Sequence, residues 1–148
     1  AHARTSGIAL RPWTSAAGGL YSTAGDFSRL ARALAAGGSL DGVVVLQPQT
    51  VAIMLRNHLI HLPSPTTEFS DAEGFGLGGA VLLDPAGKGR TGGAGAFGWS
   101  GAASTYFSID PARRLVLILL LQHLPGGEDD LPRISTPYYN LVYDRLSQ

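Results

Sequence analysis

The sequence contains no cysteine and only one lysine, Lys88, and the missing cysteine removes several classes of chemistry. Without cysteine there is no disulfide, no thiolate metal site and no cysteine nucleophile, and the redox compartment cannot be inferred. Long hydrophobic runs are missing as well. The most apolar run, Leu115 to Leu121, is far shorter than the roughly 20 residues that cross a bilayer, so we expect no membrane span.

Charge of either sign is sparse and evenly spread. Eleven basic and eleven acidic residues give a formal net charge of zero, and charged residues make up 15% of the chain. Because the arginines are scattered, no basic stripe could follow a phosphate backbone, and we expect no nucleic-acid partner. A hydrophobic content of 45% over 148 residues is typical of a globular protein with a sizeable core, and we treat 1–148 as a single region.

Three segments have the residue spacing of amphipathic helices. The first follows Thr23, an N-cap residue with Asp26 three positions later, and ends at Gly37-Gly38. The second begins near Pro48, because proline suits a first helical turn. The third covers residues 136–146 at the C-terminal end and is expected to pack on a sheet.

The C-terminal half otherwise has the periodicity of strands. Strand candidates cover 75–83, 105–109 and 115–122, with turns at 84–89 and 110–114. The last candidate is apolar on both faces, which predicts a central strand covered on each side. The sequence therefore predicts an α+β fold in which helices pack on an antiparallel sheet.

Residues 74–79 match the dinucleotide-binding pattern Gly-x-Gly-x-x-Gly letter for letter. That pattern holds a pyrophosphate only where a strand precedes it and a helix follows it. Here residues 80–83 follow and have strand character. We interpret the glycines as close packing between neighbouring strands, and we expect no cofactor.

Residues 98–102, Gly-Trp-Ser-Gly-Ala, approximate the nucleophile elbow of α/β hydrolases, with alanine in place of the last glycine. Downstream, Asp110 or Asp129 and His123 follow in an order that would complete a triad. An elbow lies between a buried strand and a helix, whereas Ser100 follows glycine-rich sequence and precedes a predicted hairpin. The sequence context therefore argues against the elbow.

Two further patterns have a structural explanation that is simpler than a catalytic one. His58 and His61 lie three residues apart and could share a helix face, but no third ligand has a supporting spacing, so we expect loop histidines and no metal. The segment 138–140 fits a Tyr-x-Asn pattern, but its place in the predicted terminal helix favours packing. His123, at the end of a predicted strand, is a weak candidate for a cleft residue.

Several segments in a fixed order resemble one known family. They are residues 17–27, the helix end at Gly37-Gly38, residues 46–51, the strand opening at 74–78 and, above all, residues 97–111. Over nearly the whole chain these segments resemble serine hydrolases of the class C β-lactamase type, which include family VIII carboxylesterases and related D-peptidases and acyltransferases. The resemblance implies the C-terminal part of a β-lactamase/transpeptidase-like fold of the penicillin-binding-protein type.

The resemblance also implies a mechanism. In this family the serine of a Ser-x-x-Lys motif is acylated, and that lysine and the tyrosine of a Tyr-x-Asn motif move protons. A third motif, Lys-Thr-Gly in the lactamases and often Trp-Gly-Gly or His-x-Gly in esterase-like members, lies on the strand beside the acyl pocket. Trp99, Ser100 and Gly101 occupy this position and would contact the substrate. The backbone N–H of Ala102, next to Gly101, would be one of two oxyanion-hole donors.

Two departures from the family pattern shape the functional expectation. Trp99 replaces the lysine that would hold a β-lactam carboxylate, so an ester or other uncharged acyl substrate is favoured over a penicillin. No serine is followed three residues later by a lysine, so the nucleophile-bearing N-terminal portion is absent from this sequence. We therefore expect the C-terminal portion of a serine hydrolase that is inactive alone. Its expected partners are a small acyl substrate and either the missing portion of the same protein or a second copy.

A second hypothesis keeps the fold but not the chemistry: a non-catalytic binding or interaction module derived from the same fold. It predicts a stable monomer that binds a ligand without turning it over. The first hypothesis predicts instead an apolar face and an unpaired sheet edge where the missing portion docks. The acyl substrate stays open, and so does the compartment, between the bacterial cytoplasm and secretion or the periplasm.

Overall fold

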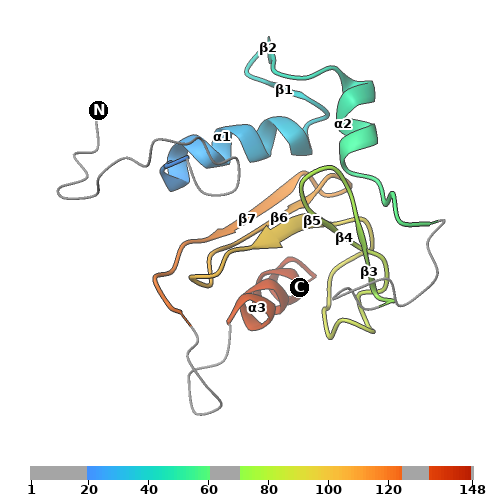
Figure 1. Ribbon diagram of the computed structural model, residues 1–148, viewed down its shortest axis with the longest axis vertical. Helices are drawn as coiled ribbons and strands as arrows, with labels where there is room; N and C mark the ends of the chain where they lie inside the picture. Colours follow the sequence, from blue (N-terminus) through green and yellow to red (C-terminus); the bar gives the residue numbers. More distant parts are fainter. Residues whose placement is uncertain (1–19, 61–70, 125–133, 148) are drawn as a thin grey trace, which may run out of the picture.

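A computed structural model of the protein describes residues 20–60, 71–124 and 134–147 (Figure 1). These residues contain a five-stranded antiparallel sheet in the order β3-β4-β5-β6-β7. Every strand of this sheet pairs with the next one in the sequence, so the sheet is a simple meander. Its strands are Glu73–Phe75 (β3), Ala80–Leu82 (β4), Phe97–Ser100 (β5), Tyr106–Asp110 (β6) and Leu115–Leu119 (β7).

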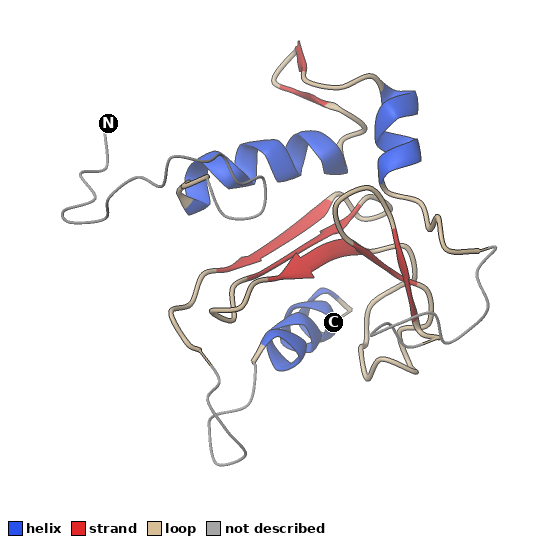
Figure 2. Cartoon of the chain, viewed as in Figure 1, coloured by secondary structure: helices blue, strands red, loops and turns tan. Residues whose placement is uncertain are grey.

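Helices cover both faces of this sheet (Figure 2). Helix α1 (Ala24–Ala35) lies across one face, and helix α3 (Ser135–Leu146) lies across the other. The short helix α2 (Pro48–Met54) lies on the α1 side. The predicted α+β fold with an antiparallel sheet is confirmed. Within the described ranges no helix combines the length and the apolar character needed to cross a membrane.

Helix α1 begins and ends where its local sequence predicts. The Thr23 side chain accepts a hydrogen bond from the Asp26 backbone N–H at 3.1 Å, which satisfies one of the free donors of the first turn. Gly37 and Gly38 both have positive φ angles, and the Gly38 N–H closes the last turn on Ala33 O at 2.7 Å. The predicted cap and stop are therefore confirmed.

The sheet separates two hydrophobic cores, because successive residues of a strand face opposite sides. In β6, Ile109 faces the α1 side and Tyr106 faces the α3 side. The core on the α1 side contains Ala31, Leu34, Ala35, Val51, Val81, Phe97 and Ile109. The core on the α3 side contains Leu82, Ala96, Tyr106, Leu117, Tyr139 and Tyr143.

The predicted strand 75–83 is in fact a hairpin of two strands. β3 ends at Phe75 and β4 begins at Ala80, and the Gly76 N–H donates to Gly79 O across the turn. Gly78 has a φ of 97°, a conformation that glycine adopts without strain. The glycines thus form a turn as well as close contacts. The segment that follows them, β4, is a strand, as the sequence predicts, whereas a dinucleotide-binding loop is followed by a helix.

The predicted cover of segment 115–122 on both faces is confirmed, but its predicted central place in the sheet is not found among the described residues. In the described part of the chain β7 pairs with β6 alone and forms an edge of the sheet. Its apolar character on both faces has another cause: Val116 packs into the α1-side core, while Leu115, Leu117 and Leu119 pack on the α3 side. Helices on both faces of the sheet therefore explain the sequence pattern, whether or not a strand is at an edge.

A small hairpin lies outside the main sheet, where the sequence predicts only a loop. β1 (Ser39–Leu40) and β2 (Val43–Val44) pair antiparallel across Asp41 and Gly42. Both turn residues have positive φ angles, 51° and 80°, as a tight two-residue hairpin turn requires. The Asp-Gly dipeptide is the signal that could have predicted it.

Candidate active site

The Trp-Ser-Gly segment forms the end of β5 and the start of its turn into β6. The β5–β6 ladder runs from the pair Phe97 and Ile109 to the pair Ser100 and Tyr106. The strands approach closely because Gly98 has no side chain: a Cβ there would collide with the carbonyl oxygen of Phe107. Ser100 is followed by a turn and a second strand, so the elbow geometry, which requires a helix at this point, is not present.

The turn from Gly101 to Thr105 is held by backbone hydrogen bonds. The Gly101 N–H donates to Thr105 O at 2.8 Å, and the Ser104 N–H donates to Gly101 O at 3.1 Å. Ser104 has a φ of 62°, which is unusual for a residue with a side chain. Its hydroxyl donates to His123 O at 2.9 Å, and the His123 N–H donates to Ala103 O at 3.2 Å. The turn is therefore tied to the chain that leaves β7.

Ala102 lies exposed at the tip of this turn. The β5–β6 ladder ends at Ser100, and no hydrogen bond between described residues uses the Ala102 N–H. A backbone donor at an exposed turn position, without an acceptor among the described residues, is available to a ligand. The position fits the expected oxyanion donor, and the role itself stays a prediction.

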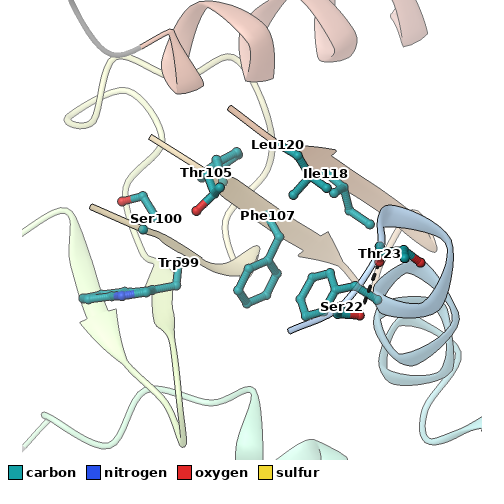
Figure 3. Close-up of a pocket in the computed structure, with 11 residues that line it drawn as sticks. Ser22, Thr23, Trp99, Ser100, Thr105, Phe107, Ile118 and Leu120 are labelled. Carbon is teal, nitrogen blue, oxygen red and sulfur yellow. Dashed lines mark hydrogen bonds between the residues drawn. The ribbon is translucent and has the colours of Figure 1, made fainter. Parts of the chain in front are cut away.

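Trp99 and Ser100 point to opposite sides of β5 (Figure 3). The Trp99 ring is 44% exposed and packs edge to face on Phe75, with ring centroids 5.3 Å apart. Phe107, opposite Trp99 in the ladder, points to the same side of the sheet as Trp99. Ser100 points toward the α3 side. The two side chains therefore belong to different surfaces, although they are neighbours in the sequence.

An apolar pocket of about 330 Å3 lies beside this strand end, on the side of Trp99 and α1. We call it the Trp99 pocket. Its lining comes from three strands and one helix and includes the small polar residues Ser22, Thr23, Ser100 and Thr105. The remaining lining residues are Phe27, Trp99, Gly101, Tyr106, Phe107, Ile118 and Leu120. No acidic or basic side chain is among them.

The structure thus brings Trp99, Ser100 and Gly101 together at the rim of one pocket, with Ala102 next along the chain. Sequence reasoning missed the helix side of this pocket. Phe27 of α1 packs on Phe107 at a centroid distance of 5.1 Å. The resemblance of residues 17–27 was a signal that this segment matters, but nothing in it indicated a contact with β6.

The other candidate residues do not converge on this pocket. His58 Nε2 lies 2.8 Å from Ile53 O, at the end of α2, and His61 lies outside the described residues. Among the residues that the structure describes, no group of three or more potential ligands could hold a metal ion. The Asn140 side chain bonds the Thr91 N–H and Gly89 O, and Tyr139 is fully buried. The Tyr-x-Asn segment therefore serves packing, as predicted, and Asp129 is outside the described ranges.

A buried carboxylate, that of Asp110, lies at the end of β6 opposite to the Gly101 turn. Asp110 is 2% exposed and accepts hydrogen bonds from the Tyr143 hydroxyl at 2.7 Å and from Arg113 Nη1 at 2.9 Å. The Arg113 backbone N–H donates to it as well, at 3.1 Å. Burial alone would raise the pKa of Asp110, but the bonds from Tyr143 and Arg113 outweigh it and hold the pKa below its ordinary value. Asp110 is therefore a structural anion and not part of a triad with Ser100.

The geometry can be compared with known proteins. The family model described as Beta-lactamase matches residues 1–135. Protein Rv1367c of Mycobacterium tuberculosis (strain H37Rv) is 41% identical over 122 residues, which are 75% of this chain and 29% of that protein. The Uncharacterized protein MT1414 of Mycobacterium tuberculosis (strain CDC 1551) matches with the same values.

The fold of the chain is also similar to that of a protein of known structure. EstCE1, described as a hydrolase with promiscuous acyltransferase activity, aligns with a TM-score of 0.57 and 25% identity. The match covers 80% of this chain and 28% of EstCE1. The chain thus spans less than a third of the length of these relatives. With an antiparallel sheet between helices and a family match over most of its residues, the chain belongs to the beta-lactamase family and is related to its hydrolases.

Proposed function

We propose that this chain is the C-terminal part of a β-lactamase-like serine hydrolase that acts through an acyl-enzyme, with an ester as the favoured substrate. The observation that carries the proposal is the strand end at Trp99-Ser100-Gly101, followed by Ala102 at an exposed turn position and bordered by an apolar pocket. This is the arrangement that the third motif of the family requires. The nucleophile would come from polypeptide that precedes this chain.

In the proposed reaction the serine hydroxyl adds to the carbonyl carbon of the ester and gives up its proton to a base on the preceding portion. The carbonyl π electrons move onto the oxygen, and the Ala102 N–H donates a hydrogen bond to the resulting anion. Collapse of this intermediate breaks the bond to the leaving alcohol, which takes up the proton. One such preorganised donor lowers the barrier by roughly 3 to 4 kcal/mol.

The Trp99 pocket supports an uncharged acyl group. Its walls are mainly aromatic and aliphatic, and none of its described lining residues is a cation that could pair with a carboxylate on the substrate. Burying an unpaired carboxylate against such walls is costly, whereas an alkyl or aryl group gains free energy there. An ester with an apolar acyl chain therefore fits this pocket better than a β-lactam with its carboxylate.

We further propose that the preceding portion docks along β7. In the described part of the chain, β7 has a neighbouring strand on one side only. Ile118 in β7 and Leu120 just after it line the Trp99 pocket, so a segment added at this edge would also border the pocket. The match covers 29% of Protein Rv1367c and 28% of EstCE1, so most of each of those proteins lies outside it, and the corresponding portion of this protein would supply that segment.

The proposal can be tested with two polypeptides, this chain and a longer one that includes the preceding gene segment. We expect no hydrolysis of p-nitrophenyl butyrate or nitrocefin by the chain alone. The longer polypeptide should hydrolyse the ester in preference to nitrocefin. Mixing this chain with the separately produced preceding portion should restore part of that activity. Turnover by the chain alone that is abolished by Ser100→Ala would contradict the proposal and restore the elbow interpretation.

A test of the proposed Ala102 donor requires a substitution that removes the backbone N–H of residue 102 and keeps its methyl side chain. Replacing the amide with an ester, with lactic acid at position 102 of the longer polypeptide, should lower kcat by about 100- to 1000-fold. The same replacement at Ala103 is the matched control and should change kcat by less than about threefold. Equal losses at the two positions would show that Ala102 has no special part.

The second candidate function is a non-catalytic binding module of the same fold, and the apolar Trp99 pocket is the observation in its favour. It predicts saturable binding of an apolar ester by a monomeric chain and no turnover by the longer polypeptide. Sedimentation velocity separates the two, because the hydrolase fragment is expected to self-associate through the β7 edge.

A further inference from the structure

A second pocket, of about 440 Å3, lies on the α3 side of the sheet, behind β5. Trp99 and Ser100 border both pockets, so β5 is the wall between them. The lining of the second pocket is polar and charged where that of the first is apolar. It consists of Glu73, Ala80, Leu82, Lys88, Arg90, Ala96, Gly98, Trp99, Ser100, Tyr106, Ser108, Ser135 and Thr136. We call it the Arg90 pocket.

Arg90 is held in place by two aromatic rings. Its guanidinium carbon lies 5.3 Å from the centroid of the Tyr106 ring and 4.7 Å from that of the Tyr139 ring. Its Nη1 donates a hydrogen bond of 2.8 Å to the Tyr106 hydroxyl. Stacking on aromatic rings and one fixed hydrogen bond restrict a side chain that is otherwise flexible. The guanidinium is therefore preorganised.

No described carboxylate neutralises Arg90. Glu73, the one acidic residue among the described lining residues, forms an ion pair with Lys88 at 2.5 Å. Arg90 takes part in none of the ion pairs between described residues. The described lining residues thus include two cations and one anion, and among them the uncompensated positive charge belongs to Arg90, the cation that is held most firmly. A partly buried charge of this kind is normally paired.

The free edge of Arg90 has the shape of a carboxylate partner. Its Nε is buried, and no described group accepts a hydrogen bond from it. With Nη1 committed to Tyr106, Nη2 is the other terminal donor, and the buried Nε beside it completes a fork that matches the two oxygens of a carboxylate once the surrounding atoms move aside. A buried guanidinium donor without an acceptor costs free energy that an incoming acceptor would recover.

The neighbouring hydroxyls can serve the same anion. Tyr106 is 6% exposed and Ser108 is 1% exposed, and both line the pocket. Burial raises the pKa of Tyr106, although Arg90 opposes the shift, so the phenol keeps its proton. Because the Tyr106 oxygen accepts from Arg90, its own proton is available to donate. Donors from β6 and from the loop between β4 and β5 therefore line one pocket.

We propose that the Arg90 pocket binds a carboxylate group, either of a small free acid or of an acidic side chain. The site is distinct from the Trp99 pocket, and its existence does not depend on the proposed hydrolase activity. It also differs in chemistry, since it takes an anion whereas the Trp99 pocket takes an apolar group.

Titration calorimetry with the 148-residue chain tests this at constant ionic strength, with chloride as the reference anion. Acetate is the probe for a small acid, and N-acetylglutamate amide is the probe for an acidic side chain. We expect saturable binding of at least one of them in the millimolar range. The tighter of the two identifies the source of the carboxylate.

The decisive variant is Arg90→Gln, which should weaken binding by at least about tenfold. Arg145→Gln is the matched control, because Arg145 is exposed on α3 and outside the pocket, and it should leave the affinity unchanged within about twofold. Ser108→Ala keeps the packing intact if Arg90→Gln fails to fold, and it should weaken binding by about threefold to tenfold.

The same titrations are repeated with Glu128, Asp129 and Asp130 changed to their amides, so that acids close in sequence to Ser135 cannot compete with the probe. Saturable binding that is lost in Arg90→Gln and kept in Arg145→Gln supports the proposal in either background. No saturable binding in both backgrounds, or binding that is insensitive to both Arg90→Gln and Ser108→Ala, overturns it.

Discussion

The two turns at the ends of β6 differ in whether their polar groups have hydrogen-bond partners among the described residues. At the Asp110 end, the carboxylate is buried and receives three hydrogen bonds, one from Tyr143 and two from Arg113. At the Gly101 end, the turn is exposed at its tip, and the N–H of Ala102 has no acceptor among the described residues. The Asp110 turn satisfies its buried carboxylate with hydrogen bonds from the protein, whereas the Gly101 turn leaves the Ala102 N–H at an exposed position.

The difference separates a structural residue from a candidate functional one. A buried charged group that is fully hydrogen bonded stabilises one conformation and offers nothing to a ligand. A fixed backbone donor at an exposed turn contributes little to stability and is available for recognition. Mutations at the Asp110 end should therefore change stability, while those at the Gly101 end should change function with little effect on folding.

The largest effect is expected for Asp110→Ala. It removes the acceptor of three hydrogen bonds and leaves the buried Tyr143 hydroxyl without its partner, so the free energy of unfolding should fall by about 3 kcal/mol. Urea denaturation followed by circular dichroism measures this loss. Asp144→Ala, at an exposed position of α3, is the control and should stay within about 0.5 kcal/mol. Equal losses for the two variants would remove the contrast between the turns.

A pair of glycine substitutions sharpens the comparison within β5. At Gly98 a Cβ would meet the backbone oxygen of Phe107, which cannot move without distorting the ladder, so Gly98→Ala should cost about 2 kcal/mol. At Gly101 the Cβ would meet Oγ1 of the Thr105 side chain, and the cost should be about 1 kcal/mol or less. Thermal unfolding compares the two variants. Adding Thr105→Ala should rescue Gly101→Ala and not Gly98→Ala, and rescue of both would show that backbone contact is not the cause.

The smallest effect is the pH dependence that Asp110 confers, because only the difference between its folded and unfolded pKa contributes. Its pKa is lowered in the folded state by Tyr143 and Arg113. The stabilisation is therefore complete above the ordinary aspartate pKa of about 4 and is lost as the pH falls through the lower, folded value. Urea midpoints measured from pH 7 down to pH 2 should fall more steeply in the unmodified chain than in Asp110→Asn. Parallel curves would contradict this assignment.

Local signals predicted most of the fold. The cap at Thr23 and the stop at Gly37-Gly38 act within one helical turn, so the bounds of α1 followed directly from the sequence. The place of β7 did not, because an apolar pattern on both faces reports the layers above and below a strand and not the number of strands that pair with it. The turn at Gly76–Gly79 was missed because its residues also fitted a continuous glycine-rich strand.

The candidate site was predictable in part for a similar reason. Trp99, Ser100 and Gly101 are neighbours in the sequence, and the family resemblance marked them directly. The pocket beside them depends on Phe27 meeting Phe107, a contact between residues 80 positions apart that no local pattern encodes. The Arg90 pocket is also tertiary, since Arg90 finds its rings on β6 and α3.

The bonds between Ser104 and the segment after β7 have a mechanical consequence. Ala103 and Ser104 share two hydrogen bonds with the His123 backbone, so the loop that displays the Ala102 amide is fastened at its base to the exit of the last strand. A displacement of the segment after β7 would be transmitted to the Ala102 amide through these two hydrogen bonds. Anything that steadies residues 120–123 therefore also fixes the direction in which that amide points.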